Sequence, residues 1–237
     1  MRISLALACD VWRVKLRETG DGSRTLHQQD LDVCYHSVHG AWTETQHVFG
    51  EMGGMPAFSR SAEGDLHVLE IGFGTGLNLP FYPEDVEEVQ AVDVNPEMAP
   101  KALARIEKVS FPVEHHVISG EAMPMENDSF DFVVSTFTLC SIAKVEQAIG
   151  EIWRVLRPGG GFCFLEHGLS SDPSVASWQK RLNPIQQVLG DGCHLNRPME
   201  QIVRSQPFEV RPIQTFYLEG VPRVIGCLYQ EQAFKPA

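Results

Sequence analysis

The sequence predicts an α/β protein built on a mostly parallel sheet, and three observations support this fold class. From Asp65 onward, short apolar runs typical of strands alternate with segments of helical periodicity. The first run, residues 67–71, leads directly into three glycines at alternate positions, which allow a ligand to approach the backbone closely. The chain has 237 residues, of which 43% are hydrophobic and 21% charged, as expected for one globular domain with additions.

The first half of this domain contains four predicted strands, at residues 67–71, 89–92, 113–118 and 130–135. A helix is expected near residues 77–82, after the glycines, and it would offer free N–H groups to a ligand. A second helix is expected to run to about residue 109. Asn95 would be its N-cap and Pro96 its first helical residue.

The second half continues the alternation. Lys144 begins a helix with an apolar stripe that extends to Leu156, and residues 157–161 are expected to turn into a strand at 162–165. An insertion follows, with a helix at 175–189 interrupted at Pro184. A helix at 199–205 and strands at 208–216 and 224–229 complete the chain. Alternating strands and helices favour a parallel sheet with right-handed connections.

Residues 1–60 form the less regular part of the sequence, which begins with a predicted short strand at 11–16. We expect this segment to be an N-terminal extension packed on the core, and residues 61–237 to form the main domain. The aromatic and histidine side chains of the extension could pack on the core or cover a ligand site as a lid, and both interpretations stay open. Those that could reach a ligand are Tyr35, His36, His39 and Trp42.

Composition excludes several classes of protein. The net charge of −12 disfavours broad binding of nucleic acid or an anionic membrane. The six cysteines lack regular spacing, so we expect reduced thiols in a cytoplasmic protein. No histidine pair has metal-ligand spacing, so we expect no metal. The apolar run at residues 3–9 is too short to span a membrane. The oligomeric state cannot be read from the sequence.

Two nucleotide classes compete for the glycine turn. A dinucleotide site requires G-x-G-x-x-G, whereas these glycines follow G-x-G-x-G, with Leu77 at the position of the missing glycine. Glu70 lies two residues before the turn, where a carboxylate would oppose a pyrophosphate and favour a cation. Asp93 ends the next strand and could accept the ribose hydroxyls of either cofactor class. The charges therefore favour the cationic, phosphate-free S-adenosylmethionine over NAD.

Three motifs resemble those of class I S-adenosylmethionine-dependent methyltransferases. Residues 68–76 resemble the first motif of that family, 129–135 its fourth-strand motif, and 155–160 the turn before its fifth strand. The resemblance covers roughly residues 65–230. It implies a Rossmann-like sheet of seven strands, mostly parallel with the last strand antiparallel, with helices on both faces. It also implies methyl transfer from S-adenosylmethionine.

The same resemblance assigns the cofactor-binding residues. Glu70 and the glycine turn would hold the methionine part, Asp93 the ribose, and the remaining residues the adenine and the sulfonium. The full set is Glu70, Gly72, Gly74, Gly76, Asn78, Asp93, Val94, Met98, Ser119, Gly120, Glu121 and Thr136. Many relatives have an aspartate where this chain has Ser119.

A narrower resemblance concerns residues 77–83, 138–141, 164–167 and 192–197. These segments are similar to a group of methyltransferases that act on small molecules, which includes alkyl thiol methyltransferases and bacterial phospholipid or quinone methyltransferases. Membrane-associated members of that group begin with a hydrophobic anchor, and this chain shows none. Residues 35–49 also faintly resemble an enzyme that modifies tRNA.

Candidate residues for the acceptor side follow from sheet geometry, because side chains past the carboxyl ends of parallel strands face the ligand crevice. Thr136 and His167 are the candidate catalytic residues, since each follows a strand, and Glu166 shares that position. Methyl transfer needs alignment more than a covalent intermediate, so Cys140 is expected to pack as a small apolar residue. The expected acceptor pocket combines Tyr35, His36, His39, Trp42, Cys140, His167, His194 and Asn196.

The function favoured by these observations is methyl transfer from S-adenosylmethionine to a sulfur or nitrogen of a small molecule. A lipid or quinone methyltransferase, a tRNA-modifying methyltransferase and a non-catalytic S-adenosylmethionine-binding module remain alternatives. Cofactor motifs alone cannot separate these, because acceptor pockets are built from the irregular segments.

Overall fold

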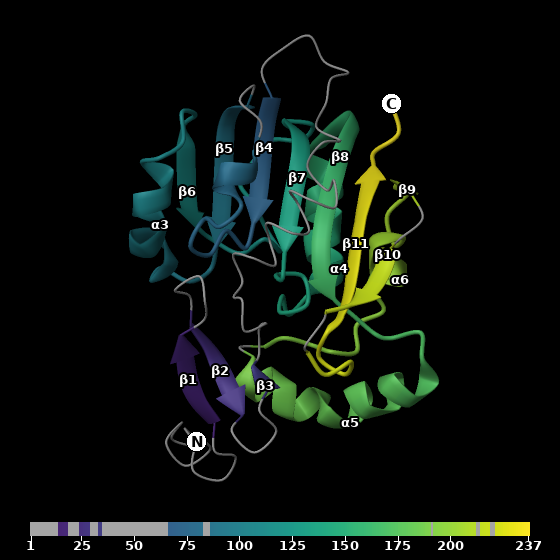
Figure 1. Cartoon of the computed structure of the whole chain (residues 1–237). Coiled ribbons are helices and arrows are strands. Elements are labelled where there is room, and N and C mark those ends of the chain that lie inside the picture. Colours follow the sequence, from purple (N-terminus) through teal and green to yellow (C-terminus); the bar gives the residue numbers. More distant parts are fainter. Residues whose placement is uncertain are drawn as a thin grey trace.

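A computed structural model gives the fold of the chain (Figure 1). It describes residues 66–82, 86–190, 192–211, 214–218 and 221–237, and the backbone alone of three short strands near the N-terminus. These strands, β1 (Val14–Glu18), β2 (Arg24–Gln28) and β3 (Val33–Cys34), form a small antiparallel sheet. Most of residues 1–60 lie outside the described ranges, so the extension and its role as a lid stay predictions.

The main sheet has eight strands in the order β10-β11-β8-β7-β4-β5-β6, with the short β9 beside β11. The five strands from β4 to β8 run parallel, and β11 is antiparallel to each of its neighbours. This confirms the Rossmann-like sheet with its last strand antiparallel, with one short strand added. The bounds are β4 (Leu66–Ile71), β5 (Val86–Asp93), β6 (Val113–Val117), β7 (Phe130–Thr136), β8 (Leu156–His167), β9 (Glu209–Val210), β10 (Gln214–Tyr217) and β11 (Cys227–Phe234).

The strand order reverses between β4 and β7. From β4 the chain proceeds outward to β5 and β6, then returns to place β7 on the other side of β4. At such a switch point the connections leave in opposite directions and open a crevice beyond the carboxyl ends of the strands. This is the edge at which a ligand site is expected.

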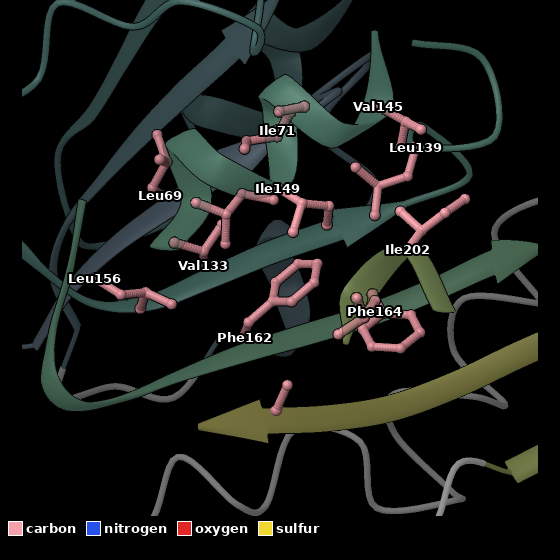
Figure 2. Packing of buried hydrophobic residues seen from close by; sticks show 14 of the residues in the cluster. Leu69, Ile71, Val133, Leu139, Val145, Ile149, Leu156, Phe162, Phe164 and Ile202 are labelled. Carbon is pink, nitrogen blue, oxygen red and sulfur yellow. The ribbon is translucent and has the colours of Figure 1, made fainter. Parts of the chain in front are cut away.

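Helices cover both faces of the sheet, as predicted. α4 (Val145–Val155) and α6 (Met199–Val203) share one buried cluster with Leu69, Val133 and Phe162 (Figure 2). α3 (Met98–Ile106) belongs to the other cluster, which contains the residues that alternate with these along the strands, Val68, Val134 and Cys163. The alternation places successive side chains on opposite faces, so each strand is buried on both sides.

Two predicted helices begin later than expected. The segment after the glycines forms only a 3-10 helix, η3 (Leu79–Phe81), in which Pro80 offers no N–H. α3 begins at Met98, because the Asn95 side chain accepts from the backbone N–H of Glu97 in a turn that precedes the helix. The prediction of an α-helix N-terminus directly after the glycine turn is therefore wrong.

Two other predicted interruptions are absent. α5 (Pro173–Leu189) continues through Pro184, after a start fixed by the Asp172 carboxylate, which accepts from the backbone N–H of Ser174. The expected turn at residues 157–161 lies inside β8, where the pairing with β7 shifts register between Phe130 and Phe132. The irregularity accommodates the Pro and Gly residues without ending the strand. In Figure 1, α5 lies across the carboxyl ends of the central strands.

Candidate active site

The glycine turn leaves β4 at the switch point of the sheet. Gly72 has φ +75°, and its N–H donates to the Val92 carbonyl at 2.8 Å, so the turn is bound to the end of β5. A Cβ on Gly72 would lie 1.7 Å from Thr138 Oγ1, in the loop after β7. No side chain fits between these segments, and Gly72 allows the two loops to meet.

Asp93, the last residue of β5, links this turn to the next loop. Its Oδ2 accepts from the backbone N–H of Gly74 at 2.8 Å, and its Oδ1 accepts from the N–H of Asn95 at 2.8 Å. Each carboxylate oxygen can accept a second hydrogen bond. Asp93 is thus held rigidly while it can still receive two ligand hydroxyls.

A cavity of about 720 Å³ lies over these loops, a volume typical of small-molecule sites. No lysine or arginine is among its described lining residues, whereas Asp93 and Glu121 are. The lining residues are Ile71, Gly72, Gly74, Val92, Asp93, Val94, Asn95, Met98, Ile118, Ser119, Gly120, Glu121, Thr136, Phe137, Thr138, Ser141, Ile142, Ala143, His167 and Gly190. The charges of this cavity suit a cationic ligand better than a phosphate.

A buried carboxylate lies below the turn. Glu70 is 1% exposed, and its two oxygens accept from Asn78 Nδ2 at 2.9 Å and from Tyr82 Oη at 2.7 Å. Burial raises the pKa of Glu70 to about 7, although these two hydrogen bonds act in the opposite direction. Asn78 Nδ2 also donates to Thr136 Oγ1 at 3.1 Å, which connects the carboxylate to the cavity wall.

Asn78 leaves one atom of this network unused. Its Oδ1 is buried and has no hydrogen-bond partner among the described residues. A buried acceptor without a donor costs about 1–3 kcal/mol, so an ammonium group of a ligand would stabilise the network. This orphaned oxygen fits a cationic amino acid end of the cofactor.

Most predicted cofactor residues meet at one cavity. Nine of the twelve line it, from the glycine turn, the end of β5 and the loops after β6 and β7: Gly72, Gly74, Asp93, Val94, Met98, Ser119, Gly120, Glu121 and Thr136. Glu70, Gly76 and Asn78 are outside the lining set: Gly76 belongs to the turn, and Asn78 donates to both Glu70 and Thr136. The cofactor-binding roles themselves stay predictions.

The predicted acceptor residues are more scattered. His167, at the end of β8, lines the cavity, whereas Cys140 is fully buried behind it. His194 lies outside the lining set, with its ring against Gln187 Nε2 at 2.9 Å, and Asn196 is half-buried and also outside it. Tyr35, His36, His39 and Trp42 lie outside the described residues.

The Glu166 side chain does not face the cavity, although its position at a strand end suggested that it would. It is fully buried and accepts four hydrogen bonds, from Ser135 Oγ and from the backbone N–H groups of Thr138, Leu139 and Cys140. Burial raises the pKa of Glu166, and the N–H donors oppose this. Glu166 therefore anchors the loop after β7 and does not itself line the cavity.

Sequence reasoning missed several lining residues in that loop. Phe137, Thr138 and Ser141 all face the cavity, and Phe137 has φ +53°, a conformation rare for a bulky residue. The available signal was their position directly after β7, next to Thr136. Nothing in the sequence pattern indicated the reversal at Phe137, whose N–H donates to the Leu165 carbonyl at 2.8 Å.

Cys140, His167 and Cys193 form a buried cluster beside the cavity. The two Sγ atoms are 3.5 Å apart, and His167 Nδ1 lies 3.9 Å from Cys140 Sγ and 3.7 Å from Cys193 Sγ. The hydrogen bond with Cys193, together with burial, raises the pKa of Cys140 well above its usual value. Cys140 is therefore a buried thiol, as expected, but it has polar neighbours.

Comparison with known proteins identifies the class that this fold and cavity define. The sequence model of a protein family described as a methyltransferase domain matches residues 69–164. Thiol S-methyltransferase TMT1B of Rattus norvegicus is 35% identical over 178 residues, which cover 70% of this chain and 72% of that protein. The chain belongs to the class I S-adenosylmethionine-dependent methyltransferases, and S-adenosylmethionine is its methyl donor.

Within that class, the similarity extends to a human protein. Thiol S-methyltransferase TMT1A of Homo sapiens is 37% identical over 158 residues, covering 64% of this chain and 63% of that protein. The crystal structure of YcgJ from Bacillus subtilis has a TM-score of 0.62 at 20% identity, covering 81% of this chain and 99% of that one, and it supports the fold. Among the described helices, none is long and apolar enough to cross a membrane.

Proposed function

We propose that this enzyme transfers the methyl group of S-adenosylmethionine to the thiol sulfur of a small molecule. The two mammalian relatives are thiol S-methyltransferases, which supports a sulfur acceptor. The observation that carries the proposal is the charge of the acceptor side. None of the described cavity residues that follow β7 and β8 carries a carboxylate. The nearby Glu166 carboxylate is buried and accepts hydrogen bonds from the loop after β7, so it does not face an acceptor.

This feature separates a thiol from an amine. A protonated amine entering the cavity would need a carboxylate to offset its charge and to receive its proton. The described acceptor side instead offers hydroxyl groups from Thr136, Thr138 and Ser141 with apolar side chains from Phe137 and Ile142. Such a surface suits a neutral, polarisable group.

The protein's own contribution is alignment and exclusion of water. When bound, S-adenosylmethionine supplies a methyl carbon already activated by its sulfonium. Asp93 would hold the ribose, and Glu70 with Asn78 the ammonium end, which fixes the methyl group near Thr136. His167 would orient the acceptor sulfur from the end of β8, and the thiol proton can leave to water because thiols are weak acids near neutral pH.

Turnover with a panel of acceptors tests the proposal. We expect S-adenosylhomocysteine to form with 2-mercaptoethanol and other alkyl thiols, and not with ethanolamine, phosphatidylethanolamine vesicles or bulk tRNA. Preference for an amine or lipid acceptor would overturn the choice of sulfur. Tight cofactor binding without turnover on any acceptor would instead favour the non-catalytic binding module.

The N-terminal extension and the insertion would determine the size of acceptor that the cavity admits. Gly190, at the end of α5, already reaches the cavity from the insertion at residues 166–200. Residues 1–60 would close the remaining side. Removal of residues 1–60 should raise the KM for the thiol more than the Kd for S-adenosylmethionine, because the cofactor is bound by loops of the main domain.

A further inference from the structure

Cys140, His167 and Cys193 form a buried cluster, and the two thiols have no part in binding the cofactor or in the proposed transfer. Its members are 1%, 5% and 1% exposed, and one ligand atom of each lies within 4.8 Å of the others. They come from three different segments, namely the loop after β7, the end of β8 and the turn after α5. The sheet and the insertion bring them together.

The spacing of the three atoms matches a tetrahedral zinc site. With Zn–S of about 2.3 Å and Zn–N of about 2.0 Å, two ligand sulfurs lie about 3.8 Å apart and a sulfur lies about 3.5 Å from a nitrogen. The distances in the cluster are 3.5 Å between the sulfurs and 3.7 and 3.9 Å from the sulfurs to Nδ1. An ion could enter with shifts of a few tenths of an ångström.

Charge balance is compatible with a divalent cation at this position. Arg197, buried beneath the loop after β7, donates to the carbonyl oxygens of Leu139 and Ile142, and the Glu166 carboxylate of β8 accepts from N–H groups of the same loop. These two groups offset each other. Two cysteine thiolates then offset the two charges of the metal, which leaves the buried region neutral.

We propose that Cys140, His167 and Cys193 form a Cys₂His site for Zn²⁺ at the back of the methyl-transfer cavity. On binding, two S–H bonds break, two Zn–S bonds form, and two protons leave to solvent, with no change of oxidation state. A fourth ligand comes from water or from the Ser141 hydroxyl, whose oxygen lies 3.7 Å from Cys140 Sγ on the cavity side.

This site would fix a residue of the cavity wall. A metal on Nδ1 of a neutral imidazole leaves the proton on Nε2, which makes that edge of His167 a hydrogen-bond donor. The site would also tie the insertion, through Cys193, to the loop after β7. The metal is therefore a positioning element and stands apart from the acceptor chemistry.

Cobalt substitution of the full-length chain tests the site without relying on activity. Protein purified under reducing conditions and loaded with one equivalent of Co²⁺ should show tetrahedral d–d absorption and a thiolate-to-cobalt band, which Zn²⁺ displaces. Absence of that spectrum in the unmodified chain overturns the proposal. So does recovery of Cys140 and Cys193 as a disulfide after reducing purification with no metal bound.

Variants then locate the ligands. Cys140→Ala and Cys193→Ala should each weaken Zn²⁺ binding by at least about tenfold, measured by competition with a colorimetric chelator. Cys163→Ala is the matched control, because Cys163 is also a buried thiol but lies on the opposite face of the sheet. Equal loss of zinc in all three variants would contradict the assignment.

Discussion

The Asp93 carboxylate accepts a 2.8 Å hydrogen bond from the backbone N–H of Gly74, so the acidic end of β5 and the glycine turn after β4 form one unit. Neither segment alone distinguishes a cofactor site from an ordinary turn or helix start. Their direct contact supports the prediction of a cofactor site, because both segments line the same cavity. The cofactor side of the site is consequently rigid before any ligand binds.

Asp93→Ala should weaken S-adenosylmethionine binding by about tenfold to a hundredfold, because hydrogen bonds to a charged group contribute roughly 1.5–3 kcal/mol. Calorimetric titration measures this Kd directly. Asp128→Asn is a suitable control: Asp128 has φ +52°, which asparagine tolerates, and its carboxylate binds the Lys235 ammonium instead of a ligand. A similar loss in both variants would mean that Asp93 acts only through folding.

Gly72→Ala should destabilise the fold and abolish cofactor binding, because the added Cβ would meet Thr138 Oγ1 at 1.7 Å in a left-handed backbone conformation. We expect a loss of about 1–3 kcal/mol in the free energy of unfolding, measured by urea denaturation. Gly150→Ala, inside α4, has its nearest new contact at 3.9 Å and should instead stabilise by about 0.5–1 kcal/mol. Equal stability of the two variants would contradict the close approach.

Glu70 should give the unliganded protein a pH-dependent stability. Since its pKa rises from 4.5 to about 7 on folding, the folded state holds the proton more tightly, and stability falls as pH rises through this interval. Across this interval the free energy of unfolding should fall by about 3 kcal/mol at most. Glu70→Gln should remove this pH dependence of the free energy of unfolding, measured by urea denaturation between pH 4.5 and about 7. An unchanged dependence in the variant would contradict the explanation.

The same carboxylate should make cofactor binding depend on pH in the opposite direction. Above about pH 7 Glu70 is ionised, and the negative charge below Asn78 attracts the ammonium and sulfonium of S-adenosylmethionine. The Kd should therefore fall as pH increases from 6 to 8. Glu70→Gln should bind more weakly at pH 8 and vary little across the range, which calorimetry in matched buffers can establish.

Glu166→Gln should lower stability by about 1–3 kcal/mol, because an amide replaces one of two buried oxygens that accept four hydrogen bonds. Thermal unfolding gives the difference. Glu200→Gln is the surface control, since Glu200 and Arg204 form an exposed pair one helical turn apart, and its effect should stay below about 0.5 kcal/mol. Comparable losses would argue against an anchoring role for Glu166.

The sequence was most informative where local pattern and tertiary structure agree. The apolar runs at residues 130–135 and 162–165 predict two strands, and the structure confirms them within β7 and β8. The glycine turn and Asp93, which the sequence predicts to act together, contact each other, and their cofactor-binding roles stay predictions. The helix predicted at residues 77–82 and the interruption predicted at Pro184 failed for opposite reasons. Pro80 restricts a short segment, whereas Pro184 lies inside a long helix that continues past it.

The acceptor side could not be predicted to the same extent. Cys140 and Cys193 are 53 residues apart and meet only because the loop after β7 and the turn after α5 converge, so no spacing rule reveals them. Glu166 and His167 are adjacent in sequence but have different surroundings, one beneath the loop and one at the cavity. Which of two neighbours faces a ligand depends on side-chain direction at a strand end, and the sequence does not specify it.

The reversed strand β11 has a consequence for the order in which the molecule assembles. Leu228 pairs with His167 and Tyr229 with Glu166, so the end of β8 is paired by residues about sixty positions further along the chain. β4 and β5, which carry the glycine turn and Asp93, pair with each other across only about twenty positions, as in Glu70 with Ala91. Because long-range pairing is slow, pulse-labelling hydrogen exchange during refolding should protect β4 and β5 before β8 and β11. The half of the enzyme that recognises the methyl donor would then be complete while the acceptor half is still forming.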